Sequence, residues 1–212
     1  MLHIDRLKAF SDGVIAVAVT LLILDLKMPV HVGISTSAQL WSIISSDDGQ
    51  ITAYLIAFVL IANGWLDHYT LFNQIDCVDE TLVKLNLLFL LTITFIPFPA
   101  SLVSNYNLTL VTIIFNVSLS LPGIVLALIS RYCFQHMESL IDFASLHKKD
   151  QEELKRLYFR RVFYPVSIVS VAIISSIVAC FNNQLGGYMW FLLFLAIPLQ
   201  KRLVSRLLFH SH

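Results

Sequence analysis

The chain has 212 residues, of which 57% are hydrophobic and only 13% are charged, whereas soluble domains are about one quarter charged. With a mean hydropathy of +0.77, this composition excludes an ordinary soluble domain and indicates an integral membrane protein. The formal net charge is zero, so no attraction to nucleic acid is expected. The three cysteines form no CxxC motif, so neither a metal site nor a disulfide framework is expected.

Six apolar stretches are long enough to cross the membrane, because about 20 helical residues span the ~30 Å hydrocarbon layer. They predict an all-α protein, one transmembrane domain, with spans near residues 5–26, 49–72, 82–103, 108–134, 160–182 and 186–208. The shorter apolar run 38–46 predicts an interfacial helix anchored by Trp41. Pro97 and Pro99 are expected to end the third span, and residues 182–187 predict a tight hairpin between the last two.

The basic residues set the expected orientation, since cytoplasmic loops carry the excess of Lys and Arg. With six spans, every Lys and Arg except Lys27 falls on one side of the membrane. Both termini are therefore expected to be cytoplasmic. The charged segment 135–160 is expected to be a cytoplasmic connector on the same side.

The first span carries a stripe of residues on one helical face, because residues three or four apart in a helix lie above one another. The stripe is about 80° wide and consists of Arg6, Phe10, Gly13, Val17, Thr20 and Leu24. Periodicity alone is compatible with either a packing face or the wall of an ion path.

Asp12 lies roughly 120° away from this stripe and is expected to point into neighbouring helices. A buried unpaired carboxylate costs several kcal/mol, so Asp12 needs hydrogen-bond donors. The expected polar lattice braces the first helix and consists of Ser11, Asp12, Trp65, His68 and Asn86. An interfacial ion pair between Arg6 and Asp12 is an alternative, and so is a proton relay at His68.

These residues resemble the signature of the transmembrane protein 175 family, which comprises lysosomal potassium channels and their prokaryotic relatives. The resemblance rests on the Arg-x-x-x-Phe-Ser-Asp run at residues 6–12, on Trp65-x-x-His68 in the second span and on Asn86-Leu-Leu in the third. It covers residues 5–103. It implies a prokaryotic plasma-membrane channel with one six-helix repeat per chain, in which a homotetramer places four copies of the first helix around a central pore.

The resemblance also assigns roles to the residues of the first helix. It implies a hydrophobic constriction at Val17, a hydroxyl layer at Thr20, and a second apolar layer at Leu24. Potassium would pass Thr20 transiently, and no resident metal or cofactor is implied. Arg6, Phe10, Ser11 and Asp12 would serve in helix packing and in the polar network.

The chain departs from the family pattern at two positions. Val17 stands where the family more usually has isoleucine or leucine, so the narrowest ring is either Val17 or Leu24. Tyr69 replaces a second histidine that often follows His68.

Passive potassium conduction with a hydrophobic gate is the expected function, since a narrow apolar throat can gate by dewetting. The partners are then potassium ions, the lipid bilayer and other copies of the chain. The alternative is a proton-coupled secondary transporter that uses Asp12 and His68, although such carriers usually show broken helices or inverted repeats. An enzyme is not expected, because the His-Glu-x-x-His and Gly-x-Ser-x-Gly motifs are missing.

Overall fold

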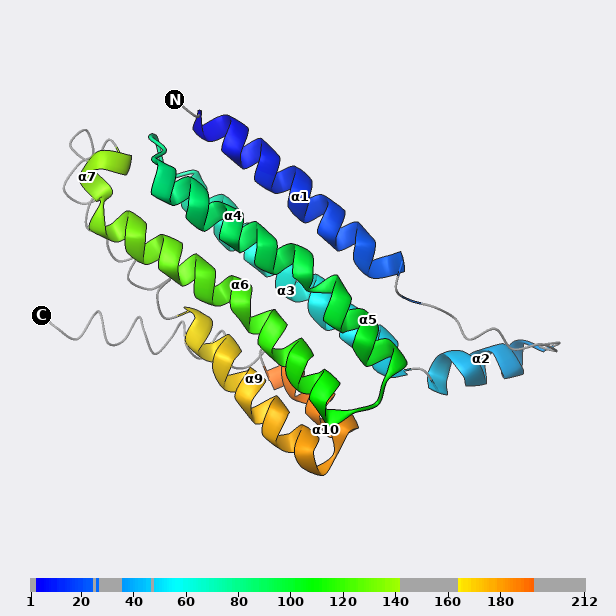
Figure 1. Cartoon of the computed structure of the whole chain (residues 1–212). Coiled ribbons are helices and arrows are strands. Elements are labelled where there is room, and N and C mark those ends of the chain that lie inside the picture. Colours follow the sequence, from blue (N-terminus) through cyan, green and yellow to red (C-terminus); the bar gives the residue numbers. More distant parts are fainter. Residues whose placement is uncertain (1–2, 25, 27–35, 47, 142–163, 193–212) are drawn as a thin grey trace, which may run out of the picture.

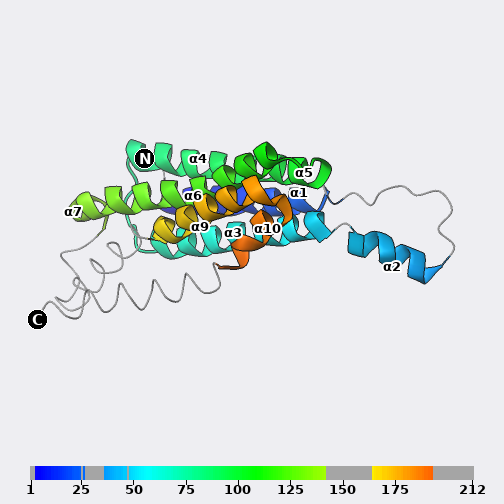
Figure 2. The same ribbon diagram turned by 90° about the horizontal axis from the view of Figure 1, so that it is seen from below.

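The computed structural model describes residues 3–24, 26, 36–46, 48–141 and 164–192, and the regular elements in these ranges are helices. Five long helices run side by side as a bundle (Figures 1 and 2). They are α1 (Ile4–Leu24), α3 (Asp48–Phe72), α4 (Glu80–Phe95), α6 (Thr109–Gln135) and α9 (Tyr164–Phe181). Buried Leu71, Phe72, Phe89, Ile93 and Ile129 belong to the apolar core of this bundle.

Shorter helices connect or extend the bundle. They are α2 (Ser37–Ser46), α5 (Pro97–Asn105), α7 (Met137–Leu140), α10 (Asn183–Tyr188) and the 3-10 helix η2 (Met189–Leu192). Helix α2 lies beyond the end of the bundle (Figures 1 and 2) and exposes Trp41. The helix expected at 38–46 is therefore present, and its location at the membrane interface stays a prediction.

Four helical stretches are long and apolar enough to cross a membrane, and they coincide with the first four expected spans. Their bounds are Ile4–Leu24, Gly49–Phe72, Glu80–Val103 and Thr109–Gln135. The fifth expected span corresponds to α9, whose apolar part, Pro165–Phe181, is shorter than these four. Residues 160–163 and 193–208 of the last two expected spans lie outside the described residues. A total of six spans and cytoplasmic termini therefore stay predictions.

The third span does not end at its prolines, so that expectation was wrong. Helix α4 ends at Phe95, and Ile96 keeps helical angles (φ −55°, ψ −41°) while α5 begins directly at Pro97. Proline is tolerated here because the first position of a helix needs no N–H donor. The preceding residue, Ile96, donates its N–H to the Ile93 carbonyl at 3.2 Å. One apolar stretch thus continues through two helices.

The chain folds back tightly against α9 at Asn182, as expected, but the residues after this turn form a short helix, α10 (Asn183–Tyr188). Asn182 caps α10 by accepting a hydrogen bond from the Leu185 N–H at 3.2 Å. Polar and glycine residues suggested a loop, but Asn182 is a good helix cap. Gly186 lies so close to α9 that an added Cβ would be 2.7 Å from the Ala179 Cβ and 2.9 Å from its Cα.

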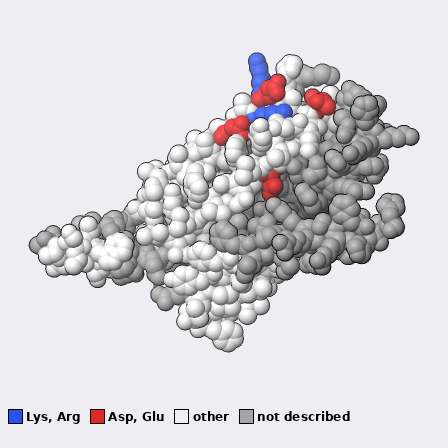
Figure 3. All heavy atoms as spheres, turned by 180° about the vertical axis from the view of Figure 1, so that it is seen from behind, with Lys and Arg blue, Asp and Glu red and all other residues white. Residues whose placement is uncertain are grey.

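The surface of the bundle is largely apolar, as a lipid-facing surface requires. Large hydrophobic side chains are exposed on α1, α3, α4, α6 and α9. On the face shown in Figure 3, most charged side chains of the described residues gather at one end of the molecule, beside a broad uncharged surface. Glu80 and Lys84 form an exposed ion pair at 2.7 Å on α4.

The close contact at Gly186 predicts that Gly186→Ala destabilises the protein by about 1–3 kcal/mol, because the new methyl group overlaps backbone atoms that cannot move aside freely. The measurement is the thermal unfolding midpoint in detergent. Gly187→Ala is the matched control, since nothing lies within 4 Å of a Cβ at that position. Equal midpoints for the two variants would contradict the close packing of α10 on α9.

Candidate pore helix and polar network

Helix α1 packs into the bundle through one face. The buried residues of this face recur every three or four positions and are Leu7, Ser11, Ile15, Ala18 and Leu22. They face the side of the bundle formed by α3 and α4, on which α1 packs. The spacing is that of an amphipathic helix, except that the second face of α1 is apolar as well.

The stripe expected from the sequence lies on the outward face of α1. Val17 is 56% exposed and Leu24 is 69% exposed within one chain, and Phe10 is exposed too. Arg6, Gly13 and Thr20 share this exposure. The outward face is therefore available to lipid, to another copy of the chain or to a water-filled path.

The Thr20 hydroxyl has a fixed orientation. It donates a hydrogen bond to the Val17 carbonyl of its own helix at 2.8 Å. A hydroxyl has one donor and two acceptor lone pairs, so this bond uses the hydrogen and leaves acceptor capacity on the oxygen. An exposed oxygen of this kind can meet water or a cation.

A chain of buried hydrogen bonds joins α1, α3 and α4. The Asn86 Nδ2 donates to the Ser11 Oγ at 2.9 Å, and the Asn86 Oδ1 lies 2.7 Å from the His68 Nε2. Ser11 in turn donates to the Leu7 carbonyl at 2.8 Å. With the amide in this orientation its oxygen accepts, so His68 Nε2 carries the proton. One amide therefore fixes three helices relative to one another.

His68 is sealed inside the bundle by two phenylalanine rings. It is 1% exposed and stacks on Phe72 at 4.1 Å and on Phe89 at 5.1 Å between ring centroids. This enclosure, together with the bond to Asn86, suits a structural histidine better than a proton relay exposed to water. Tyr69, by contrast, is exposed.

Asp12 accepts a hydrogen bond from the Trp65 Nε1 at 2.8 Å. The contact reaches α3, as expected, but Asp12 is exposed within one chain and not buried. The lattice thus has two parts, Asp12 with Trp65 and Ser11 with Asn86 and His68. Among the described residues of a single chain, no ion pair joins Arg6 to Asp12.

A second polar network joins α6 to α9, α10 and η2, and the sequence reasoning missed it. The Asn116 Nδ2 donates to the Ser175 Oγ and the Ser176 Oγ, both at 2.9 Å, and its Oδ1 accepts from the Trp190 Nε1 at 2.8 Å. Ser175 donates to the Gly186 carbonyl at 2.8 Å. The signal was an asparagine inside an apolar span, since such residues are costly unless paired.

The described part of the chain shows no group of three or more His, Cys, Asp or Glu side chains placed to hold a metal ion. The arrangement offers instead an outward apolar stripe on a helix whose other face is fixed by hydrogen bonds. Helices that combine lipid-type surfaces with satisfied internal polar groups define a helical integral membrane protein.

Comparison with known proteins defines the family. The sequence model described as "Endosomal/lysosomal potassium channel TMEM175" matches residues 6–97. Residues 6–97, which contain every residue of the stripe and of the first polar network, therefore belong to the TMEM175 family. The resemblance stated from the sequence is confirmed.

Several curated proteins are similar to parts of this chain. A potassium channel of Streptomyces collinus is 38% identical over 101 residues, which are 48% of this chain and 48% of the relative. A potassium channel of Chamaesiphon minutus is 37% identical over 101 residues, 48% of this chain and 49% of the relative. The human endosomal/lysosomal proton channel TMEM175 is 32% identical over 159 residues, 74% of this chain and 30% of that protein. The chain thus spans about half the length of the two bacterial relatives. These relatives are named as channels and not as enzymes.

The likeness in structure extends beyond the matched segment. The crystal structure of a lysosomal potassium-selective channel TMEM175 homolog from Chamaesiphon minutus superimposes with a TM-score of 0.71 at 25% identity, covering 94% of this chain and 97% of the other. A variant of the potassium channel MtTMEM175 gives a TM-score of 0.61 at 19% identity, covering 95% and 93%, which shows the shared fold alone. The C-terminal helices therefore follow the same fold.

The first polar network predicts that Asn86→Leu destabilises the protein by about 1–3 kcal/mol, because the buried His68 N–H loses its acceptor. The measurement is the thermal unfolding midpoint in detergent. Asn63→Leu is the control, since Asn63 donates to the Val59 carbonyl of its own helix and its loss frees no second helix. An unfolding midpoint for Asn86→Leu as high as that of the control would contradict the conclusion that the Asn86 amide stabilises the packing of the three helices.

Proposed function

We propose that the chain is the subunit of a potassium-permeable cation channel whose pore is lined by α1. The observation that carries the proposal is the outward stripe of α1, which is exposed and mostly apolar while the opposite face is packed and hydrogen-bonded. Membership of residues 6–97 in the TMEM175 family supports it, and so do the bacterial relatives named as potassium channels.

In the proposed assembly, four copies of the chain place four α1 helices around one axis. Rings of Val17 and Leu24 then form apolar constrictions, and Thr20 supplies a ring of hydroxyl oxygens between them. Potassium holds its hydration water more weakly than sodium, so a throat that strips part of this water favours potassium modestly. Small rotations of the apolar side chains can close the throat by dewetting.

The polar network has a definite task in this mechanism. A constriction formed by side chains depends on the rotation of each helix about its own axis, and a turn of 100° would replace Val17 by a neighbouring residue. The bonds from Asn86 to Ser11 and from Trp65 to Asp12 hold α1 at two adjacent positions. These bonds therefore support the orientation in which the stripe faces outward from the subunit.

The proposed setting is the prokaryotic plasma membrane with both termini in the cytoplasm. The distribution of Lys and Arg in the sequence supports this orientation. The proposed partners are potassium ions, lipid and the other copies of the chain.

Proton movement is the second candidate function, because the animal relatives are named as endosomal/lysosomal proton channels. Asp12 is exposed within one chain and could meet water. His68 is enclosed by two phenylalanine rings and Asn86, which argues against a proton-coupled carrier that uses Asp12 and His68 together.

Purified protein in liposomes distinguishes these functions. The channel proposal predicts potassium flux that follows the electrochemical gradient, with no proton movement in fixed ratio to it. Potassium flux is measured down a potassium concentration gradient, without the ionophore valinomycin. The pH inside the liposomes is followed with a trapped dye. Proton transport at constant stoichiometry with potassium would favour the carrier, whereas proton flux without potassium flux would favour a proton channel.

The stripe predicts that Val17→Ala and Leu24→Ala raise potassium conductance and lower the preference for potassium over sodium, because a shorter side chain widens an apolar ring. Single-channel recording in planar bilayers measures both quantities. Val117→Ala and Leu128→Ala on α6 are matched controls, because both residues are exposed apolar side chains outside the stripe. Wild-type currents in both α1 variants would contradict the proposal that the stripe lines the pore.

A further inference from the structure

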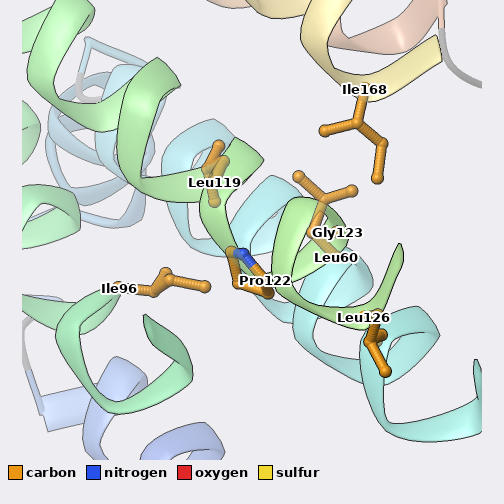
Figure 4. A pocket seen from close by; sticks show the side chains of 8 residues that line it. Leu60, Ile96, Leu119, Pro122, Gly123, Leu126 and Ile168 are labelled. Carbon is orange, nitrogen blue, oxygen red and sulfur yellow. The ribbon is translucent and has the colours of Figure 1, made fainter. Parts of the chain in front are cut away.

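The pocket beside Pro122 is too small and too apolar to bind a ligand (Figure 4). Its lining includes the buried side chains of Leu60, Ile96, Leu119 and Leu126. The space holds no more than about one water molecule, and an apolar void of this kind stays dry. A partner is therefore accommodated at the surface of the copy and not in this pocket.

The first turns of α1 carry charged side chains that one copy does not pair. Asp5 and Arg6 are adjacent in the sequence and both are exposed. Among the described residues of a single copy, the ion pair formed is that of Glu80 and Lys84, and it includes neither of them. Asp5 and Arg6 lie at the end of the bundle away from α2 (Figures 1 and 2).

The position of Arg6 is unfavourable for α1 taken alone. Helix α1 begins at Ile4, so Asp5 and Arg6 both lie in its first turn. The first turn is the positive end of the helix dipole, which stabilises an acidic side chain and destabilises a basic one. The helix dipole therefore accounts for Asp5 but not for Arg6.

Asp5 and Arg6 of the same copy are not placed to compensate each other. Successive side chains of a helix point about 100° apart, and neighbours in the sequence do not face one another. Lys8 is half-buried and forms no ion pair with Asp5 among the described residues of one copy. Within one copy, both charges are therefore left to the solvent.

Solvent alone is a poor solution for Arg6 in the proposed assembly. Arg6 belongs to the stripe of α1, so four copies place four guanidinium groups around the mouth of a path for cations. Like charges repel one another, and a ring of positive charge lowers the local concentration of potassium. A potassium channel of this design requires negative charge at the same level.

Asp5 of the adjacent copy lies at that level. In a ring with rotational symmetry, one flank of each subunit meets the opposite flank of its neighbour. Asp5 lies on the flank of the stripe that also carries exposed Ala9 and Asp12. Residues 5 and 6 differ in height by only about 1.5 Å along the helix, whereas Asp12 is about 9 Å above Arg6 and already accepts from Trp65.

We propose that Arg6 of each copy pairs with Asp5 of the next copy, so that the assembled protein carries a closed ring of alternating charges at the N-terminal mouth of the pore. The inference rests on the proposed function, because it requires four α1 helices around one axis. The ring gives the flanks of α1 a defined order around the axis. It also neutralises Arg6 where potassium enters or leaves.

Two charge-reversed chains test the pairing between copies. Asp5→Arg and Arg6→Asp are each expressed alone, and then together with different tags, as the full-length chain. Native mass spectrometry in detergent measures the tetramer fraction and its composition. Each variant alone is expected to form tetramers roughly tenfold less than the wild type, because every interface loses an attractive pair and gains a repulsive one.

The mixture of the two variants is expected to restore the tetramer. When the chains alternate around the ring, each Arg at position 5 meets an Asp at position 6, and each Asp5 meets an Arg6. Tetramers with two chains of each kind should therefore exceed the share produced by random mixing. A pair formed within one copy is broken in both variants, so mixing could not restore it. Wild-type tetramer formation by each variant alone would overturn the ring, and so would a mixture that is not restored.

The exposed pair on α4 supplies the matched control. Glu80 and Lys84 pair within one copy at 2.7 Å, and α4 begins at the same end of the bundle as α1 (Figure 1). Glu80→Arg and Lys84→Asp carry the same changes of charge. They are expected to form tetramers alone and to mix at random. Equal enrichment of mixed tetramers in this control would assign the effect to overall charge and overturn the specific pairing.

Single-channel conductance gives a second measurement that does not depend on weakened assembly. Asp5→Asn removes the neutralising carboxylate and leaves Arg6, so potassium conductance is expected to fall severalfold at about 0.01 M salt. It should return toward the wild-type value at about 1 M, where charges are screened within about 3 Å. Glu80→Gln removes a carboxylate outside the ring and is expected to have no such effect. The same ratio to wild type at both salt concentrations would contradict the ring.

The ring and the channel proposal fail in different ways. A wild-type protein that does not form tetramers would overturn both. A wild-type tetramer that conducts potassium, with no mutual rescue of Asp5→Arg and Arg6→Asp, would overturn the ring and leave the channel proposal intact.

Discussion

The structure depends on one constraint, which is that polar groups inside a bilayer must find their hydrogen-bond partners within the protein. Apolar packing alone gives a transmembrane helix little preference for one rotation over another, because lipid tails are as apolar as leucine. A single buried amide changes this. Asn86 reaches Ser11 on one helix and His68 on another, and only one rotation of α1 satisfies it. The direction of the outward stripe follows from that bond.

The networks around Asn86 and Asn116 both satisfy buried polar groups with a carboxamide side chain. A carboxamide offers two donors and an oxygen acceptor, so one asparagine can join three elements without any charge. Asn116 does so for α6, α9 and η2, as Asn86 does for α4, α1 and α3. A tryptophan N–H adds a further hydrogen bond near each asparagine: Trp65 donates to Asp12, and Trp190 donates to Asn116. No net charge has to be buried in either network.

Much of the N-terminal part of the fold could be predicted from the sequence, because the length, hydropathy and helical spacing of a segment are local properties. The first four spans, the outward stripe and the partnership of Ser11, His68 and Asn86 followed from them and from the family resemblance. The remainder depends on tertiary contacts. The apolar stretch continues past Pro97 because a second helix, α5, begins there directly after α4. Helix α10 packs on α9 through the close approach of Gly186 to Ala179.

Gly13 lies on the outward face of α1, where the packing of a single chain does not require a glycine. Glycine within a helix is less favourable than alanine by about 1 kcal/mol, yet no neighbouring atom lies within 4 Å of a Cβ built at this position. The fold of the subunit would therefore accommodate a larger residue. In the proposed assembly, residue 13 would therefore bear on the space between neighbouring copies of the chain and not on the stability of one copy.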